Sequence, residues 1–295
     1  MAVQVVRGET VFFFGESHVL GFAERIVQRG GAPPLMCHTF FLRGAVCFAN
    51  VATPEGALCA PLKDALQFSR LFVDTQDDEP EQSVYVARSS QWRFVARQRF
   101  AVPPLVVLNF GQYDIFQAIE SFPAPDFHLP ELRSMHRLAG PFASRTIMGA
   151  SDARFAHEWF AQRIAPFRVA LARLRELGIT RLATLAIPPP TLDEHACEAT
   201  VRLLGGSGTP EKLRAAFRYK VALLLNALVR EVCDAEDCVF LDSWPLLTRN
   251  GLLRPDVVLA DEVHLNDRAT DIILQHLIAP AAVRTSDESE IVSMR

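Results

Sequence analysis

The sequence has little of what membrane-spanning, secreted or nucleic-acid-binding proteins need. Its longest stretch without a charged residue, 100–113, is shorter than the roughly 18 to 20 apolar residues that cross a bilayer. Only three of the 30 basic residues are lysines, the net charge is −4 and no basic stripe is present, so no nucleic-acid surface is indicated. The first residues also lack the basic start and apolar core of a signal peptide. We therefore expect a cytoplasmic protein that takes neither nucleic acid nor a membrane as its partner.

Motifs for metals and cofactors are missing as well. The six cysteines form no C-x-x-C pair and no cluster with histidines at zinc spacing, which favours buried, reduced thiols. The sequence has no Gly-x-Ser-x-Gly elbow, no Walker A loop and no intact Gly-x-Gly-x-x-Gly. We expect neither a metal nor a cofactor, so any chemistry must come from ordinary side chains.

The proportions of the chain are those of a globular protein, with 49% apolar and 22% charged residues. For 295 residues we predict one domain over 1–283, although two domains are possible at this length, and a flexible polar tail over 284–295. The segment 121–150 contains four prolines and is too long for an ordinary connection. We predict that it forms a lid over a substrate pocket; the alternative is a surface excursion packed by its own aromatic residues.

Apolar runs and helical spacings alternate along the chain, which is typical of a doubly wound parallel sheet. Central strands are predicted at 11–15, 35–41, 105–110, 181–187 and 238–241, with shorter strands at 1–7, 84–87 and 92–96. Helices are predicted at 20–29, 62–73, 151–177 with a kink or division at Pro166, 209–235, and from a cap at Asn266 or Asp267 to Pro280. The fold class that follows is α/β, with a central parallel sheet of about five strands.

One strand ends in a polar turn that carries chemically active side chains. The apolar run 11–14 is followed by Gly15, Glu16, Ser17 and His18. A run of this kind favours a central parallel strand covered on both faces, and ligands of open α/β sheets bind where such strands end. Ser17 therefore lies at the expected place for a nucleophile, although a serine there can also serve only as the N-cap of the next helix.

Near the other end of the chain, an acid precedes a histidine by three residues. Asp261 and His264 stand just ahead of the last predicted helix. A serine hydroxyl becomes a good nucleophile when an imidazole accepts its proton and a carboxylate orients that imidazole. Asp242 is a rival carboxylate, but aspartates at strand ends often cap turns, so we rank it below Asp261.

These motifs resemble those of the SGNH hydrolases, the GDSL-like esterase and acyltransferase superfamily, in order and spacing over nearly the whole chain. The matching blocks are Gly15-Glu16-Ser17, Leu42-Arg43-Gly44-Ala45, Gly111-Gln112-Tyr113-Asp114 and Asp261-Glu262-Val263-His264. Two blocks depart from the family pattern, because Glu16 replaces the usual aspartate and Tyr113 replaces the usual asparagine. The resemblance implies a flavodoxin-like, three-layer α/β/α fold.

The resemblance also implies roles for individual residues in an acyl-transfer reaction. Ser17 would attack an ester carbonyl, His264 would move the proton, and Asp261 would orient His264. The backbone amides of Ser17 and Gly44 would hold the oxyanion, with Gln112 or Tyr113 as a side-chain substitute for the asparagine.

The expected partner is a small-molecule or glycan acyl ester, and the sequence leaves the oligomeric state open. We favour an esterase or deacetylase. Two alternatives remain, an O-acyltransferase that uses a sugar hydroxyl as acceptor, and a binding protein with a degenerate oxyanion site. The departures at Glu16 and Tyr113 favour the last of these.

Overall fold

A computed structural model gives the three-dimensional arrangement of most of the chain. It describes residues 4–6, 9–23, 25–29, 32–42, 46–69, 98–100, 102–124, 126–127, 150–151, 153–191, 202, 215–249, 252–259 and 264–282.

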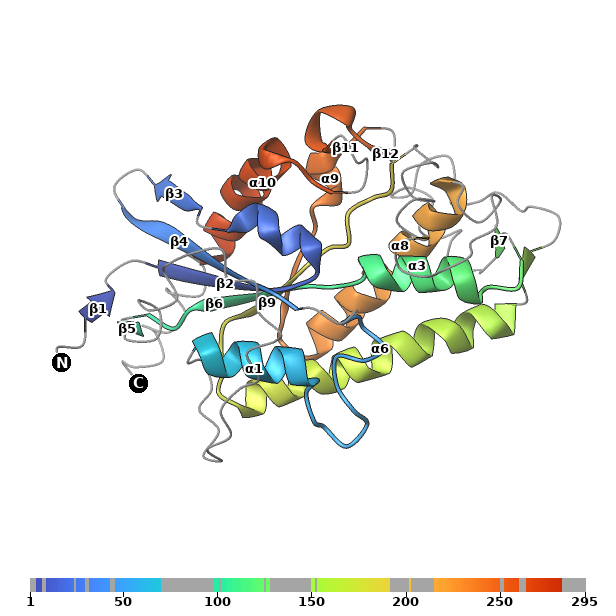
Figure 1. Ribbon diagram of the computed structural model, residues 1–295, viewed down its shortest axis with the longest axis horizontal. Helices are drawn as coiled ribbons and strands as arrows, with labels where there is room; N and C mark the ends of the chain where they lie inside the picture. The colour runs from blue at the N-terminus through green and yellow to red at the C-terminus, as the bar shows by residue number, and fades with distance from the viewer. Residues whose placement is uncertain are drawn as a thin grey trace.

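The centre of the protein is a six-stranded sheet with the order β10-β9-β6-β2-β4-β3 (Figure 1). Its strands are β2 (Glu9–Gly15), β3 (Ile26–Arg29), β4 (Ala32–Phe41), β6 (Leu105–Asn109), β9 (Leu182–Leu185) and β10 (Val239–Leu241). All neighbouring pairs are parallel except β3, which runs antiparallel to β4 at one edge. The prediction of a parallel sheet of about five strands is therefore confirmed, with one antiparallel strand added.

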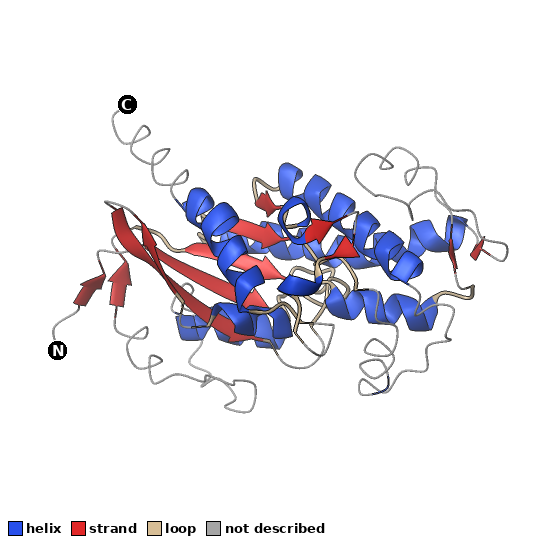
Figure 2. Ribbon diagram, turned by 90° about the horizontal axis from the view of Figure 1, so that it is seen from above, coloured by secondary structure: helices blue, strands red, loops and turns tan. Residues whose placement is uncertain are grey.

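Helices cover both faces of this sheet, as Figure 2 shows from above. The helical segments are η1 (Ser17–Phe22), α1 (Ala60–Ser69), α3 (Gln112–Ser121), α6 (Ala153–Glu176), α8 (Ala215–Ala235), α9 (Trp244–Leu247), η4 (Pro255–Val257), α10 (Asp267–Ile273) and the π-helical η5 (Leu274–Ile278).

The alternation of side chains along β2 explains why both faces are apolar. Phe12 and Phe14 pack into one cluster with side chains of α1, α3, α6 and α8. Val11 and Phe13 point the other way and pack against η1, α9 and α10. Successive residues of a strand point to opposite faces, so a strand buried on both sides must be apolar throughout. The predicted three-layer α/β/α fold is confirmed.

Among the described residues, three small two-stranded sheets lie outside the central sheet. They pair β1 (Gln4–Val6) with β5 (Gln98–Phe100), β7 (Asp126–Phe127) with β8 (Ala150–Ser151), and β11 (Thr248–Arg249) with β12 (Leu252–Leu253).

The predicted helix at 20–29 is wrong. The chain instead forms the 3-10 helix η1 and then the strand β3, whose Ile26 and Val27 pair with Met36 and Leu35 of β4. The apolar residues of this stretch fit either structure. The strand forms because the edge of β4 offers backbone hydrogen bonds to it. The glycine pair at 30–31 suits the end of a helix, but two glycines between β-rich runs are equally a signal for a hairpin.

Pro166 was predicted to kink or divide a helix, and the division does not occur. The 24 residues of α6 form one helix with Pro166 inside it. Apolar side chains on both sides of the proline are buried in the same core, among them Phe160 and Phe167. Packing of both halves against one core therefore holds the helix continuous despite the missing backbone hydrogen bond. Near the end of the chain, helical residues likewise continue beyond Pro280 to residue 282.

Several predicted segments lie outside the described residues. These are the strands at 84–87 and 92–96, the first part of the helix at 209–235, most of the lid segment 121–150 and the tail 284–295. Among the helices that are described, none combines the length and apolarity that a membrane crossing requires.

Candidate active site

The structure brings Ser17 and His264 together, although 247 positions separate them in the sequence. Ser17 Oγ and His264 Nε2 lie 2.7 Å apart, a hydrogen-bonding distance. Ser17 is the first residue of η1 and lies two residues after Gly15, the carboxyl end of β2. His264 lies shortly before α10, which packs on the same side of the sheet as η1. This is the spatial relation that a nucleophile and its general base require.

Backbone hydrogen bonds hold the segment that carries His264. The amide of Leu259 donates to the carbonyl of His264 at 2.8 Å, and the amide of Asn266 donates to the carbonyl of Val257 at 3.0 Å. The Asn266 side chain accepts from the amide of Ala269 at 3.1 Å and so caps α10, as predicted. The imidazole is thus placed by a capped helix start.

Asp261 and Gly44 lie outside the described residues, so their roles stay predictions. The rival carboxylate of Asp242 has partners of its own. It accepts hydrogen bonds from the guanidinium of Arg230 and, at 3.1 Å, from the backbone amide of Trp244 at the start of α9. The Asp242 side chain therefore accepts from the backbone two residues further on, which is the turn-capping role that its place at a strand end suggested.

Gly15 is required by the close approach of two strands below the nucleophile. A Cβ atom at this position would lie 2.0 Å from the backbone carbonyl oxygen of Asn109, the last residue of β6. The amide of Glu16 donates to the same carbonyl at 3.1 Å. The turn that presents Ser17 is therefore locked to the end of the neighbouring strand.

Glu16 has a role that the sequence did not reveal. One of its carboxylate oxygens accepts from the amide of Gly111 at 2.9 Å and the other from the amide of Tyr113 at 3.1 Å. These amides belong to the N-terminus of α3, whose unpaired N–H groups favour a carboxylate. Burial raises the pKa of Glu16 to about 8, helped by the nearby charge of Asp114 and opposed by these backbone hydrogen bonds.

Gly111 makes this arrangement possible. Its φ of +113° is a left-handed conformation, and a Cβ atom there would lie 2.5 Å from the Ile187 side chain and 2.7 Å from the ring of Phe48. A glycine is needed on both counts. It turns the chain out of β6 so that α3 begins with its amides facing Glu16.

A second buried carboxylate continues the connection away from the nucleophile. Asp114 of α3 is fully buried and accepts from the amide of Phe48 at 2.9 Å. Burial raises the pKa of Asp114 to about 6, while the Phe48 amide and the charge of Arg163 act in the opposite direction. Through this contact, α3 holds the segment that follows the predicted Gly44 block.

The two predicted oxyanion side chains, Gln112 and Tyr113, form the first turn of α3 and are both half-buried. The backbone amide of Tyr113 is already engaged by Glu16. The backbone of Gln112 also interacts with the Glu16 carboxyl group, so the side chains of this pair stay the candidates for an oxyanion donor.

His18 is a further residue whose position the sequence reasoning missed. Its ring is buried, and its centroid lies 5.2 Å from that of His264. The available signal was its place directly after Ser17, at the end of a central strand. A second imidazole therefore lies against the one that contacts the nucleophile.

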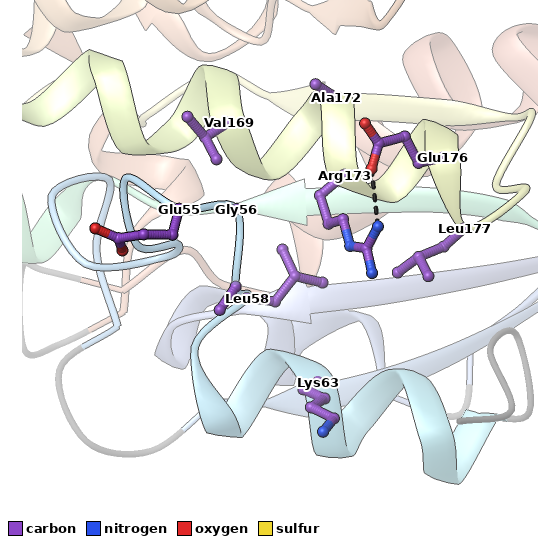
Figure 3. A pocket seen from close by; sticks show the side chains of 10 residues that line it. Glu55, Gly56, Leu58, Lys63, Val169, Ala172, Arg173, Glu176 and Leu177 are labelled. Carbon is purple, nitrogen blue, oxygen red and sulfur yellow. Dashed lines mark hydrogen bonds and ion pairs between the residues drawn. The ribbon is translucent and has the colours of Figure 1, made fainter. Parts of the chain in front are cut away.

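Two pockets contrast in their chemistry. One, of about 560 Å³, is lined by Ser17 and His264 together with apolar residues of η1 and of the segment before α10. The other, of about 610 Å³, lies between α6 and the segment around Glu55 and contains the ion pair of Arg173 and Glu176 at 2.8 Å (Figure 3). The described lining of the second pocket contains no hydroxyl or imidazole, whereas the first pocket has both.

Thiols and metal ligands add no further site within the described part of the chain. Five cysteines are described and all are free, four of them buried. No group of three or more His, Cys, Asp or Glu side chains among the described residues is arranged to hold a metal ion.

Comparison with solved structures returns proteins of the kind that the sequence motifs resemble. A GDSL-like lipase from Bacteroides thetaiotaomicron is 14% identical, with 97% of this chain and 93% of that chain covered and a TM-score of 0.41. A proposed acylhydrolase from Bacteroides fragilis is 14% identical, with 94% and 88% covered and a TM-score of 0.39. The OSK domain of Drosophila Oskar is 13% identical over 66% of this chain and 67% of that chain, with a TM-score of 0.29.

No protein-family model matches the chain, and no curated protein sequence matches it either. At these identities and TM-scores, the functional proposals depend on the side-chain geometry of this chain. That geometry consists of a three-layer α/β/α fold with a serine and a histidine in contact at the carboxyl edge of its sheet. The chain thus has the three-layer α/β/α fold that the resemblance of its sequence motifs to the SGNH hydrolases implies.

Proposed function

We propose that the protein is a serine-dependent ester hydrolase that works through an acyl-enzyme intermediate. The observation that carries this proposal is the 2.7 Å contact between Ser17 Oγ and His264 Nε2 at the end of a central strand. A serine in contact with an imidazole, at the edge of the sheet where ligands bind, is the arrangement that activates a hydroxyl for attack.

The reaction takes place in two steps. In the first, Ser17 Oγ attacks the ester carbonyl carbon, its proton passes to His264 Nε2, and the same proton is then given to the departing alcohol oxygen as the carbon–oxygen bond breaks. In the second, His264 takes a proton from water, the hydroxide attacks the acyl group, and Ser17 leaves with the proton restored. Asp261 is proposed to orient His264, and the amides of Ser17 and Gly44 with the Gln112 or Tyr113 side chain are proposed to hold the oxyanion.

The geometry of Glu16 favours an enzyme over a binding protein with a degenerate site. The replacement of the usual aspartate was one of two departures that supported a binding protein. In this chain the longer side chain engages two backbone amides at 2.9 and 3.1 Å beside the nucleophile. A residue with satisfied hydrogen bonds in the turn that presents Ser17 supports an intact site.

Covalent labelling tests the proposal directly. A fluorophosphonate should add its phosphonyl group to Ser17 in the wild type, seen as one mass increment in the intact protein, and Ser17→Ala and His264→Ala should abolish or strongly slow this labelling. Ser121→Ala is the matched control, because Ser121 is exposed and bonds only to the carbonyl of Gln117 among the contacts described. Equal labelling of the wild type and Ser17→Ala would refute the assignment of the nucleophile.

Partition of the acyl-enzyme distinguishes hydrolysis from transfer. An esterase releases the free acid at the same rate whatever alcohol is added, whereas a transferase forms a new ester at the expense of the acid as a sugar acceptor is raised. We expect the free acid to remain the main product with sugars, since the sequence has no motif for a nucleotide-linked acyl donor.

A further inference from the structure

The pocket beside Ser17 and His264 has a markedly apolar wall. Leu20 and Gly21 of η1 form one side, and Leu259 and Leu265 form the other. Its volume of about 560 Å³ lies within the range of small-molecule sites. The pocket can therefore hold one part of an ester whose carbonyl lies at Ser17.

Two of these leucines are exposed. Leu20 is 41% and Leu259 46% exposed, and they are two of the four large apolar side chains that are exposed in the described part of the chain. Single exposed leucines are common on protein surfaces. Here, two of the four exposed apolar side chains lie beside the same hydroxyl and imidazole. A bound apolar group would cover both of them.

The charged groups at this pocket are already paired within the protein. Asp267 accepts from the guanidinium of Arg25, and Arg268 lies 3.2 Å from a carboxylate oxygen of Asp256. The Asn266 side chain caps α10 and also donates to two backbone carbonyls. Among the described residues, the lining thus offers apolar surface to a ligand, while its charges are neutralised by partners.

The chemistry of the proposed reaction decides which part of the ester lies there. His264 Nε2 must give its proton to the departing alcohol oxygen, so that oxygen lies next to the imidazole. The carbonyl oxygen points instead to the proposed oxyanion donors. Leu259 and residues 264–268 of the lining belong to the part of the chain around His264, so the pocket extends on the side of the alcohol rather than the acyl group.

We propose that this pocket is a leaving-group site that selects esters of apolar alcohols, with Leu20 and Leu259 as its specificity-determining residues. The inference rests on the proposed function and goes beyond it by naming the substrate class. Polyhydroxylated leaving groups such as sugars gain little from an apolar wall, whereas an alkyl chain gains up to about fourfold in kcat/KM for each methylene that it buries.

Two series of esters test the inference. The first varies the alcohol, from ethyl to hexyl acetate, and the second varies the acid, from ethyl acetate to ethyl hexanoate. In the wild type, kcat/KM should rise in the alcohol series by roughly 15- to 250-fold over four methylenes, for half to full burial of each. Leu20→Ala and Leu259→Ala should each reduce the hexyl-to-ethyl ratio at least about threefold and leave the ratio in the acid series unchanged.

Controls separate this inference from the proposed function. Ile26→Ala removes a side chain that is 58% exposed on β3 and should leave both ratios at their wild-type values. Fluorophosphonate labelling of Ser17 at the wild-type rate shows that a leucine variant retains its nucleophile. If Ser17 is labelled but kcat/KM does not rise along the alcohol series, the leaving-group site alone is refuted. The same holds if the leucine variants change the ratio in the acid series instead. Absence of both labelling and ester hydrolysis in the wild type refutes the proposed function and the inference with it.

Discussion

Replacing Glu16 with glutamine tests how the buried turn beside the nucleophile is held. The wild-type side chain is 9% exposed and bonds through both oxygens to backbone amides of α3. Two effects compete there, because burial raises the pKa of Glu16 from 4.5 to about 8 while the amides favour the charged form. Glu16→Gln removes the titratable proton while keeping the size of the side chain.

The sign of the expected effect follows from proton linkage. Between pH 4.5 and 8 the folded protein retains a proton on Glu16 that the unfolded chain has released, so the free energy of unfolding falls as the pH rises. The pKa of Asp114 is raised only to about 6. Between pH 6 and 8, Glu16 is therefore the carboxyl group of this pair whose titration changes the free energy of unfolding. One proton corresponds to about 1.4 kcal/mol per pH unit, or about 3 kcal/mol over this window.

We expect Glu16→Gln to be within about 1 kcal/mol of the wild type at pH 6, since one lost hydrogen bond has roughly that value. At pH 8 the variant should be the more stable of the two by about 2 to 3 kcal/mol. Urea unfolding at pH 6, 7 and 8, followed by tryptophan fluorescence, measures the difference. Histidine titration is common to both proteins and cancels in the comparison.

Glu120→Gln is the control, because Glu120 is an exposed residue of the same helix and its replacement should leave the pH dependence unchanged. A difference between the wild type and Glu16→Gln that stays constant from pH 6 to 8 would refute the reasoning. It would mean that the two amides outweigh burial and keep the carboxylate of Glu16 ionised at neutral pH.

Two further predictions concern turnover. Asp261→Asn should lower kcat by several hundredfold or more with little change in KM, because His264 would lose the group that fixes its tautomer. Steady-state kinetics on a short-chain ester measures this effect. An unchanged kcat would remove Asp261 from the mechanism. An oxyanion donor supplies roughly 3 to 4 kcal/mol, so either Gln112→Ala or Tyr113→Phe should lower kcat about a hundred- to a thousandfold with substrate binding nearly unchanged. Wild-type turnover in both variants would leave the oxyanion to backbone amides alone.

The central strands and the proximity of Ser17 and His264 follow from local features of the sequence. The run at 11–14 is apolar at every position, and only a strand buried on both faces needs that pattern. Parallel strands end at the same edge of a sheet, so a strand-end serine and a histidine just before a helix can be expected to meet. Their 2.7 Å contact is the outcome of these two local signals.

The errors arose where local signals were compatible with two structures. Ile26 and Val27 fit a helical spacing as well as a strand, and the free edge of β4 decided between them. Pro166 normally interrupts a helix, yet burial of side chains before and after it keeps α6 continuous. Both outcomes depend on tertiary packing, which the order of residues along a short segment does not reveal.

The role of Glu16 could not be predicted for a different reason. Its partners lie 95 and 97 positions away and are backbone amides. Nearly every residue type has such an amide, so the only signal in the sequence is Gly111. Once the structure is known, three blocks of the predicted site connect through buried carboxylates. Glu16 joins the nucleophile turn to the start of α3, and Asp114 joins α3 to the amide of Phe48, just beyond the Gly44 block. The candidate oxyanion residues Gln112 and Tyr113 are therefore fixed relative to Ser17 by buried carboxyl groups that the protein must desolvate. A substitution at either acid is expected to affect folding and turnover together, because one set of hydrogen bonds supports both.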